Sequence, residues 1–251
     1  FYCWGHVFVV VMSTVFFAVF GIQNWRILAF IWALIPFFNA FYYMLVPIRT
    51  LSEENESVPV KKLLKNKLFW VFALLMVCAG ASEQAMSQWA SAFAEAGLSV
   101  SKTIGDLTGP CMFAILMGLA RVFYARFSER IRLTRVLALC CVTCAAGYLL
   151  AVFAPNPILS LAGCGLVGLS VGMFWPGTFS LASSACTGGG TAMFALLALA
   201  GDLGCAGGPT AVGMVSEAAG ANIKAGLLAA IVFPIMLIAG LFICGRLNKS
   251  K

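Results

Sequence analysis

The sequence predicts an all-α integral membrane protein, a helical bundle with about eight transmembrane helices. Of its 251 residues, 62% are hydrophobic and only 10% are charged, whereas a soluble domain is about half apolar and a quarter charged. The apolar residues form long runs, and a helix that crosses a bilayer needs roughly 20 such residues. The basic residues alternate between the two ends of successive runs. This composition excludes a soluble enzyme, a disordered chain and a nucleic-acid-binding module.

Eight apolar segments follow one another along the chain. They are 4–21, 25–48, 68–93, 104–125, 134–153, 158–183, 191–215 and 222–244. Because the runs are continuous and do not alternate with polar residues, helices are favoured over a β-barrel. The connections are short except for 49–67, where three Glu residues precede four Lys residues. This stretch predicts a loop between two helical bundles, with two spans before it and six after it.

The Lys and Arg residues predict the orientation of the spans. One side of the membrane would hold Arg49, Lys61, Lys62, Lys65, Lys67, Arg121, Arg126, Arg130, Arg132, Arg135, Arg246, Lys249 and Lys251. The other side would hold Arg26, Lys102 and Lys224. Cytoplasmic loops carry the excess of basic residues in membrane proteins. We therefore expect the first side, with both ends of the chain, to face the cytoplasm from the cell (inner) membrane.

The reactive residue types are too sparse for an enzyme. Most of the ten Cys residues lie within apolar runs, where a thiol packs as a small hydrophobe. Cys141 and Cys144 have the spacing of a redox or metal pair, but His6 is the single His of the chain and no second Cys pair has ligand spacing. A GxxxxGK[ST] nucleotide-binding loop is absent. We expect no metal, no cofactor and no enzymatic activity.

Glu83 lies near the middle of segment 68–93, and an ionisable side chain at that depth is a functional candidate because it is costly in a bilayer. With helical periodicity, one face of this segment collects its small and polar residues. These are Gly80, Glu83, Gln84, Ser87, Gln88 and Ser91. Such a face indicates the lining of a water-filled cavity, and an interhelical hydrogen-bond network is the alternative. In a cavity, Glu83 could take up a proton or hydrogen-bond a polar substrate.

Two further polar residues lie inside apolar segments. Asp202 is in the middle of 191–215, among small residues that are typical of a close helix contact. It could be a proton site, or it could pair with a basic residue of another helix. Asn39 lies among aromatic residues that suit a sugar-like ligand, although such residues are also ordinary in a core or an interface.

Three segments resemble motifs of the Major Facilitator Superfamily, especially its fucose-permease-like branch. Residues 117–131 are similar to the basic loop after the second span of each bundle, with Ala120 in place of the usual Gly. Residues 165–177 are Gly-rich and end in Phe-Trp-Pro-Gly, similar to the tenth span, and 201–213 are similar to the eleventh. The position of Glu83 in its span also resembles that branch.

The resemblance implies a twelve-span transporter of which this chain holds the last eight spans. The chain begins inside an apolar run without a Met, which agrees with a partial chain. Residues 1–48 would be the last two spans of the N-terminal bundle, 49–67 the cytoplasmic loop between bundles, and 68–251 the C-terminal six-helix bundle with a short cytoplasmic tail. The missing N-terminal four spans would pack against them, and the two bundles would rock about a central site.

The predicted function is secondary active transport of a small polar solute, sugar-like or another metabolite, across the lipid bilayer by alternating access, with protons as the expected coupling ion. The candidate substrate or proton-coupling residues are Glu83, Gln84, Ser87, Gln88, Asn39 and Asp202. The resemblance places Arg121, Arg126 and Arg130 at a cytoplasmic gate, with membrane anchoring as the alternative for the last two. The alternative functions are a drug or metabolite exporter of the same superfamily, and a non-transporting sensor or degenerate fragment.

Overall fold

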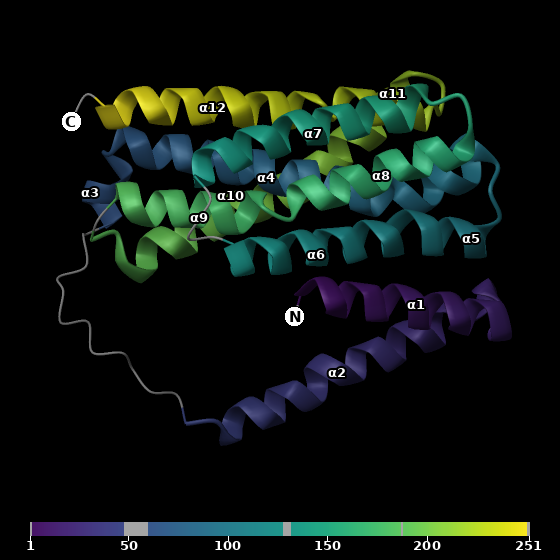
Figure 1. Cartoon of the computed structure of the whole chain (residues 1–251). Helices are drawn as coiled ribbons and strands as arrows, with labels where there is room; N and C mark the ends of the chain where they lie inside the picture. Colours follow the sequence, from purple (N-terminus) through teal and green to yellow (C-terminus); the bar gives the residue numbers. More distant parts are fainter. Residues whose placement is uncertain (1, 48–59, 128–131, 187, 250–251) are drawn as a thin grey trace.

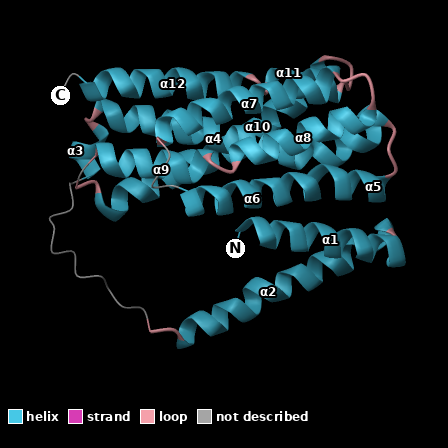
Figure 2. Ribbon diagram, viewed as in Figure 1, coloured by secondary structure: helices cyan, strands magenta, loops and turns pink. Residues whose placement is uncertain are grey.

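The computed structural model describes residues 2–47, 60–127, 132–186 and 188–249, and these ranges are almost wholly helical (Figure 1). Figure 2 shows no strand among them. Eight helical spans in these ranges are long and apolar enough to cross a membrane. They are Tyr2–Phe20, Ile22–Leu45, Lys67–Gly97, Lys102–Phe127, Leu133–Phe153, Pro157–Ala185, Gly190–Ala218 and Ile223–Leu247. The predicted class, an all-α membrane bundle with eight spans, is confirmed.

The first two spans form a hairpin that lies beside the other six (Figure 1). Helix α1 (Tyr2–Phe20) and helix α2 (Trp25–Leu45) are joined by a 3-10 turn, η1 (Ile22–Asn24). Gly21 adopts a φ of 81° before this turn, a conformation that a residue with a Cβ atom rarely takes. Helix α1 contacts the larger group through α6, whereas α2 diverges from it and leaves most of its apolar side chains exposed.

The polar stretch 49–67 is described only in its second part, because residues 48–59 lie outside the described ranges. A short helix, α3 (Val60–Leu64), precedes helix α4 (Lys67–Ala92). The Asn66 side chain caps α4 by accepting a hydrogen bond from the backbone N–H of Leu68 at 3.0 Å. The cap explains why the helix begins next to the predicted residue 68.

Helix α4 lies in the centre of the six-span group, and most of its side chains are buried. It continues through a π-turn, η2 (Phe93–Gly97), and packs most closely on helix α10 (Gly190–Ala218). A Cβ atom at Gly204 or Gly208 would collide with backbone atoms of α4. The GxxxG spacing of these two glycines therefore brings two backbones into direct contact, as is common in membranes.

The fourth and fifth spans both pack on helix α8 (Pro157–Val171). Helix α5 (Lys102–Asp106), the π-turn η3 (Leu107–Cys111) and helix α6 (Met112–Phe127) form one continuous span. Pro110 lies inside the π-turn, where its missing N–H and its ring interrupt the regular helical hydrogen bonds. Helix α7 (Leu133–Phe153) returns across the membrane, and residues 128–131 between them lie outside the described ranges.

The sixth span is broken in the middle. Helix α8 (Pro157–Val171) ends at its cap residue Gly172, and helix α9 (Phe174–Ala185) begins two residues later. Pro176 is in the first turn of α9, where it has no N–H to donate to the carbonyl oxygen of Gly172, four residues before it. The predicted segment 158–183 is therefore two helices whose junction leaves one backbone acceptor without a helical donor.

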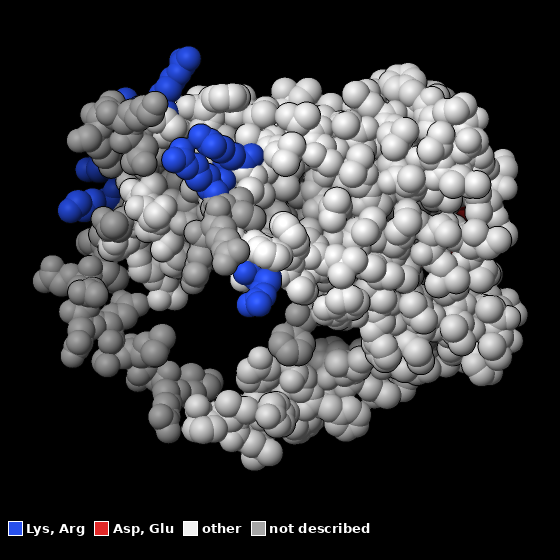
Figure 3. All heavy atoms as spheres, viewed as in Figure 1, with Lys and Arg blue, Asp and Glu red and all other residues white. Residues whose placement is uncertain are grey.

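The last span also consists of two helices, α11 (Ile223–Ala229) and α12 (Val232–Lys249). The Asn222 side chain caps α11 by accepting hydrogen bonds from the backbone N–H groups of Lys224 and Ala225. On the face shown in Figure 3, the Lys and Arg side chains gather at the end of the bundle that carries α3 and the C-terminus. This is the grouping of basic residues that the sequence predicts.

Candidate functional site

A cavity of about 580 Å³ lies between α1, α4, α6, α9 and α10. Its walls carry charged, amide and aromatic side chains. They are Tyr2, Glu83, Gln84, Arg121, Trp175, Pro176, Phe179, Asp202 and Cys205. Both acids that the sequence places at the middle of a span, Glu83 and Asp202, line this one cavity.

Glu83 is the most buried charged group of the cavity, with an exposed fraction of 3%. Arg121 Nη2 lies 3.8 Å from Glu83 Oε2, which is close enough for an ion pair but longer than a hydrogen bond. Glu83 Oε2 accepts no hydrogen bond from any part of the chain that the structure describes. The carboxylate therefore has a cation nearby to balance its charge, and one oxygen on which a proton or a ligand donor could be held.

Tyr2 connects the carboxylate to the amide side chains of α4. Its hydroxyl donates a hydrogen bond to Glu83 Oε1 at 3.1 Å and accepts one from Gln84 Nε2 at 3.4 Å. Gln88 Nε2 in turn donates to Gln84 Oε1 at 3.3 Å. The guanidinium of Arg121 lies 5.4 Å from the centre of the Tyr2 ring, within the range of a cation–π contact. Glu83 and Gln84 of the polar face of α4 thus line the cavity, and Gln88, Gln84 and Tyr2 form a hydrogen-bond chain that reaches α1.

The break in the sixth span fixes the position of Arg121. Arg121 Nε donates a hydrogen bond to the carbonyl oxygen of Gly172 at 3.1 Å. This is the carbonyl that Pro176 leaves without a helical donor. A charge-assisted bond to a backbone carbonyl is stronger than a neutral one, so the guanidinium is held between α4 and α8.

Aromatic rings form another part of the cavity wall. Trp175 and Phe179 of α9 have ring centroids 6.1 Å apart, and Phe179 lies 5.7 Å from the ring of Phe194 on α10. A Cβ atom at Gly201 would collide with the Trp175 indole, so this glycine makes the space that the large ring occupies. A few polar groups in an otherwise apolar and aromatic lining are typical of a small-molecule site.

The structure does not bring every candidate residue to the cavity. Ser87 is buried in α4 and lies outside the cavity lining. Gln88 is also outside the lining, but it donates a hydrogen bond to the lining residue Gln84. Asp202 lines the cavity and is exposed, and it forms no hydrogen bond or ion pair with another described residue. Asn39 is exposed on α2, outside the cavity lining.

The three arginines assigned to a gate lie in different places. Arg126 is exposed in the last turn of α6, and Arg130 lies outside the described residues. Arg121 is well inside α6, and its side chain turns into the cavity. Its pairing with Glu83 was not predicted, although an Arg more than one turn inside the segment 104–125 is itself a sign of an intramembrane charge.

Five further residues line the cavity and are not among the candidates that the sequence predicts, namely Tyr2, Trp175, Pro176, Phe179 and Cys205. Tyr2 lies before the predicted start of the first segment, and nothing in the local sequence indicates that its hydroxyl faces Glu83. Within the described ranges, no group of three or more His, Cys, Asp or Glu side chains could hold a metal ion.

The fold and the cavity define a polytopic α-helical membrane protein with a charged, partly aromatic site between its helices. The chain belongs to the Major Facilitator Superfamily, whose family model matches residues 1–209. This membership and the fold indicate a transporter family and not an enzyme family, as the sequence predicts.

Two solved structures have a similar fold. A crystal structure of FucP, a Major Facilitator Superfamily transporter in the outward conformation, matches with a TM-score of 0.66 and 19% identity. A point variant of the E. coli fucose:proton symporter FucP matches with a TM-score of 0.65 and 20% identity. Each match covers 83% of this chain and 51% of the other, so the chain spans about half the length of the solved structures it resembles. No curated protein sequence matches the chain.

Proposed function

We propose that the protein is a secondary active transporter that moves a small polar solute, sugar-like or another metabolite, together with protons. The observation that carries the proposal is the buried carboxylate of Glu83 beside Arg121, in a cavity between α1 and the six-span group. Charged residues within membrane spans mark substrate and proton paths. The fucose:proton symporter among the structural matches makes a monosaccharide the first substrate class to test.

In this proposal, Glu83 couples proton movement to solute binding. When Glu83 takes up a proton, its attraction for Arg121 is lost, while the guanidinium keeps its contacts with the Tyr2 ring and the Gly172 carbonyl. Gln84 and Asp202 then offer the amide and carboxylate groups that solute hydroxyls can bind. The aromatic wall of Trp175 and Phe179 supports the apolar face of a sugar-like ring.

We further propose the division into bundles that the resemblance implies. Residues 1–48 belong to the N-terminal bundle, 49–67 to the loop between bundles, and 68–251 to the C-terminal bundle. The large apolar side chains that α1 and α2 expose are then the surface on which four further N-terminal spans pack. The basic end of the molecule faces the cytoplasm, in an inner membrane.

The test is solute-driven proton movement in proteoliposomes that contain the protein as its gene encodes it. Fucose is the first probe, followed by a panel of monosaccharides, and a pH-sensitive dye in the lumen reports proton entry. The Glu83→Gln variant is expected to abolish proton movement without reducing expression, because the amide keeps the shape of the carboxyl group but binds no proton.

The matched control is Glu95→Gln, which removes a carboxylate from the exposed end of the same span and is expected to retain proton movement. Proton movement that survives in the Glu83→Gln variant would contradict the assigned role. An exporter of the same superfamily would instead expel a preloaded solute, and a sensor would bind a probe without moving it.

A further inference from the structure

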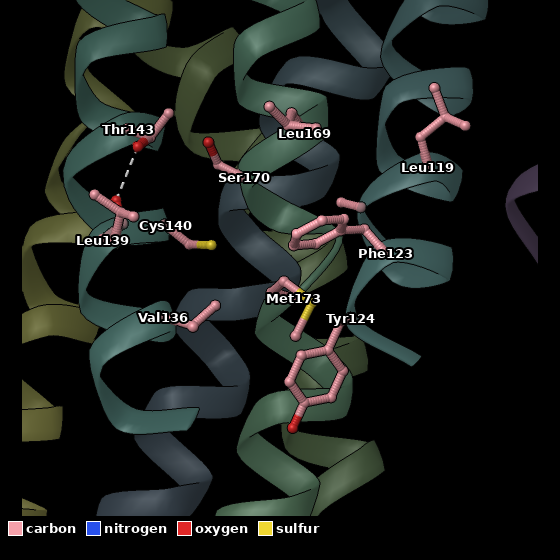
Figure 4. A pocket seen from close by; sticks show the side chains of 11 residues that line it. Leu119, Phe123, Tyr124, Val136, Leu139, Cys140, Thr143, Leu169, Ser170 and Met173 are labelled. Atoms are coloured by element: carbon pink, nitrogen blue, oxygen red, sulfur yellow. Dashed lines mark hydrogen bonds between the residues drawn. The ribbon is translucent and has the colours of Figure 1, made fainter. Parts of the chain in front are cut away.

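A second cavity, of about 440 Å³, lies on the outer side of the six-span group between α6, α7 and the end of α8 (Figure 4). Its walls include Leu119, Phe123, Tyr124, Val136, Cys140 and Met173. None of its lining residues belongs to the cavity around Glu83. The side chains at its rim are strongly exposed, with 60% for Phe123 and 65% for Leu139. In a membrane-spanning bundle, this cavity opens toward the lipid.

The cavity offers almost no polar chemistry to a ligand. Three lining residues carry a hydroxyl group, Tyr124, Thr143 and Ser170, and the hydroxyls of Thr143 and Ser170 donate to the backbone of their own helices. Thr143 Oγ1 donates to the carbonyl oxygen of Leu139 at 2.9 Å, as Figure 4 shows, and Ser170 Oγ donates to that of Leu166 at 2.7 Å. Since the Thr143 and Ser170 hydroxyls are already used and the other lining residues except Tyr124 are apolar or carry a thiol, the cavity suits an apolar chain better than a polar solute.

Three arginines lie one helical turn beyond the cavity, toward the basic end of the bundle. Arg126 follows Phe123 by three residues on α6, so the two side chains share a helix face. On α7, Arg135 precedes the cavity residue Leu139 by four residues, which again places the pair on one face, and Arg132 is the N-cap residue directly before the same helix. All three arginines are exposed, and none forms an ion pair within the described part of the chain.

We propose that this groove is a binding site for an anionic phospholipid. One acyl chain occupies the cavity between α6, α7 and α8, and the phosphate headgroup is bound by Arg126, Arg132 and Arg135. Apolar walls at the level of the hydrocarbon core, and arginines at its edge that form no ion pair with another described residue, match the two parts of such a lipid. The charges stand at one end only, which favours a lipid over a second copy of this apolar helix surface.

The experiment is native mass spectrometry of the purified full-length protein after exchange with either phosphatidylglycerol or phosphatidylcholine of the same acyl chains. The wild type is expected to retain phosphatidylglycerol preferentially. Arg126→Gln and Arg135→Gln are each expected to weaken phosphatidylglycerol retention by about fivefold, because one basic residue near anionic lipid is worth about that factor in binding. Arg246→Gln, an exposed arginine of α12 at the same end, is the matched control and should change nothing.

A second pair of variants tests the acyl-chain part of the site. Thr143→Trp places a large ring in the cavity and should reduce retention of both lipids, whereas Leu149→Trp, on the exposed surface of α7 outside the cavity, should not. Equal retention of the two lipids by the wild type would overturn the proposal and indicate an ordinary layer of surrounding lipid. An equal effect of Arg246→Gln, or unchanged binding in Thr143→Trp, would also overturn it. Dimers that replace bound lipid would show that a second copy covers the groove.

Discussion

Arg121 contacts three other segments of the chain at once. Its guanidinium lies over the Tyr2 ring of α1, beside the Glu83 carboxylate of α4, and in hydrogen-bond contact with the Gly172 carbonyl at the end of α8. The carboxylate of Glu83 is almost fully buried, so it depends on this cation for its charge balance. Changing either residue alone therefore disturbs the other.

This dependence predicts a coupling between two substitutions. Arg121→Met alone leaves Glu83 buried without its cation and should lower the thermal stability of the detergent-solubilised protein. Adding Glu83→Gln should restore part of the loss, with a coupling free energy of about 1 kcal/mol, as is usual for contacting residues. Thermal unfolding followed by size-exclusion chromatography measures the four variants of the cycle. If the losses of thermal stability in the two single variants simply add in the double variant, the ion pair does not contribute to stability.

At the scale of residues, the sequence predicts which polar and charged side chains lie within the membrane spans, but not which of them contact one another. Helical periodicity puts Glu83 and Gln84 on one face, and both line the cavity. The ion pair with Arg121 and the hydrogen bond from Tyr2 join residues that are far apart in the chain. Such contacts depend on how the helices pack against one another. The periodicity of one helix shows which of its residues share a face, but not which other helix lies beside that face.

Among the helices, α4 and α10 form the closest pair. A Cβ atom at Gly204 would strike the carbonyl oxygen of Val77, whereas Gly207, on the same helix, has open space around it. This difference separates a glycine that is needed for packing from one that is not. Both lie in the interior of α10, so their helix propensities are alike.

The comparison predicts opposite results for two identical substitutions. Gly204→Ala should destabilise the protein by about 1–3 kcal/mol, because overpacking forces backbones apart. Gly207→Ala should be neutral or slightly stabilising, since Ala is the better helix former. Melting temperatures of the two purified variants provide the measurement. A Gly204→Ala variant as stable as the wild type would mean that the two helices separate at little cost.

The number of spans and most of their limits could be predicted at the scale of elements, because long apolar runs leave few alternatives. The interruptions could not be located. The sequence shows that Gly and Pro residues permit a bend in 158–183, but the break at Gly172 depends on how α8 and α9 pack on their neighbours. The π-turn that contains Pro110 depends on the same kind of contact.

For the molecule as a whole, the uneven distribution of charge has the largest consequence. Lys and Arg gather at one end of the face seen in Figure 3, and basic segments are retained in the cytoplasm during insertion. The proposed orientation rests on this asymmetry alone. The orientation requires that successive spans cross the membrane in alternating directions without exception.

Reporter fusions test that orientation in a bacterial host. A fluorescent protein fused after Lys251 should fluoresce, because such a reporter matures in the cytoplasm, and alkaline phosphatase at the same position should be inactive. Alkaline phosphatase inserted between α7 and α8, after Pro155, should be active, since that connection lies at the opposite end of the bundle. The reverse pattern would contradict the proposed orientation.

Pro176 influences charged residues on two other helices. The proline makes no direct polar contact with Glu83, yet its missing N–H leaves the Gly172 carbonyl available to Arg121. A substitution of Pro176 is therefore expected to change the position of the Arg121 guanidinium on α6 and, through it, the environment of the Glu83 carboxylate on α4. We therefore expect the effects of substitutions at positions 176 and 121 to be non-additive. Related chains that differ at one of the two positions should therefore tend to differ at the other.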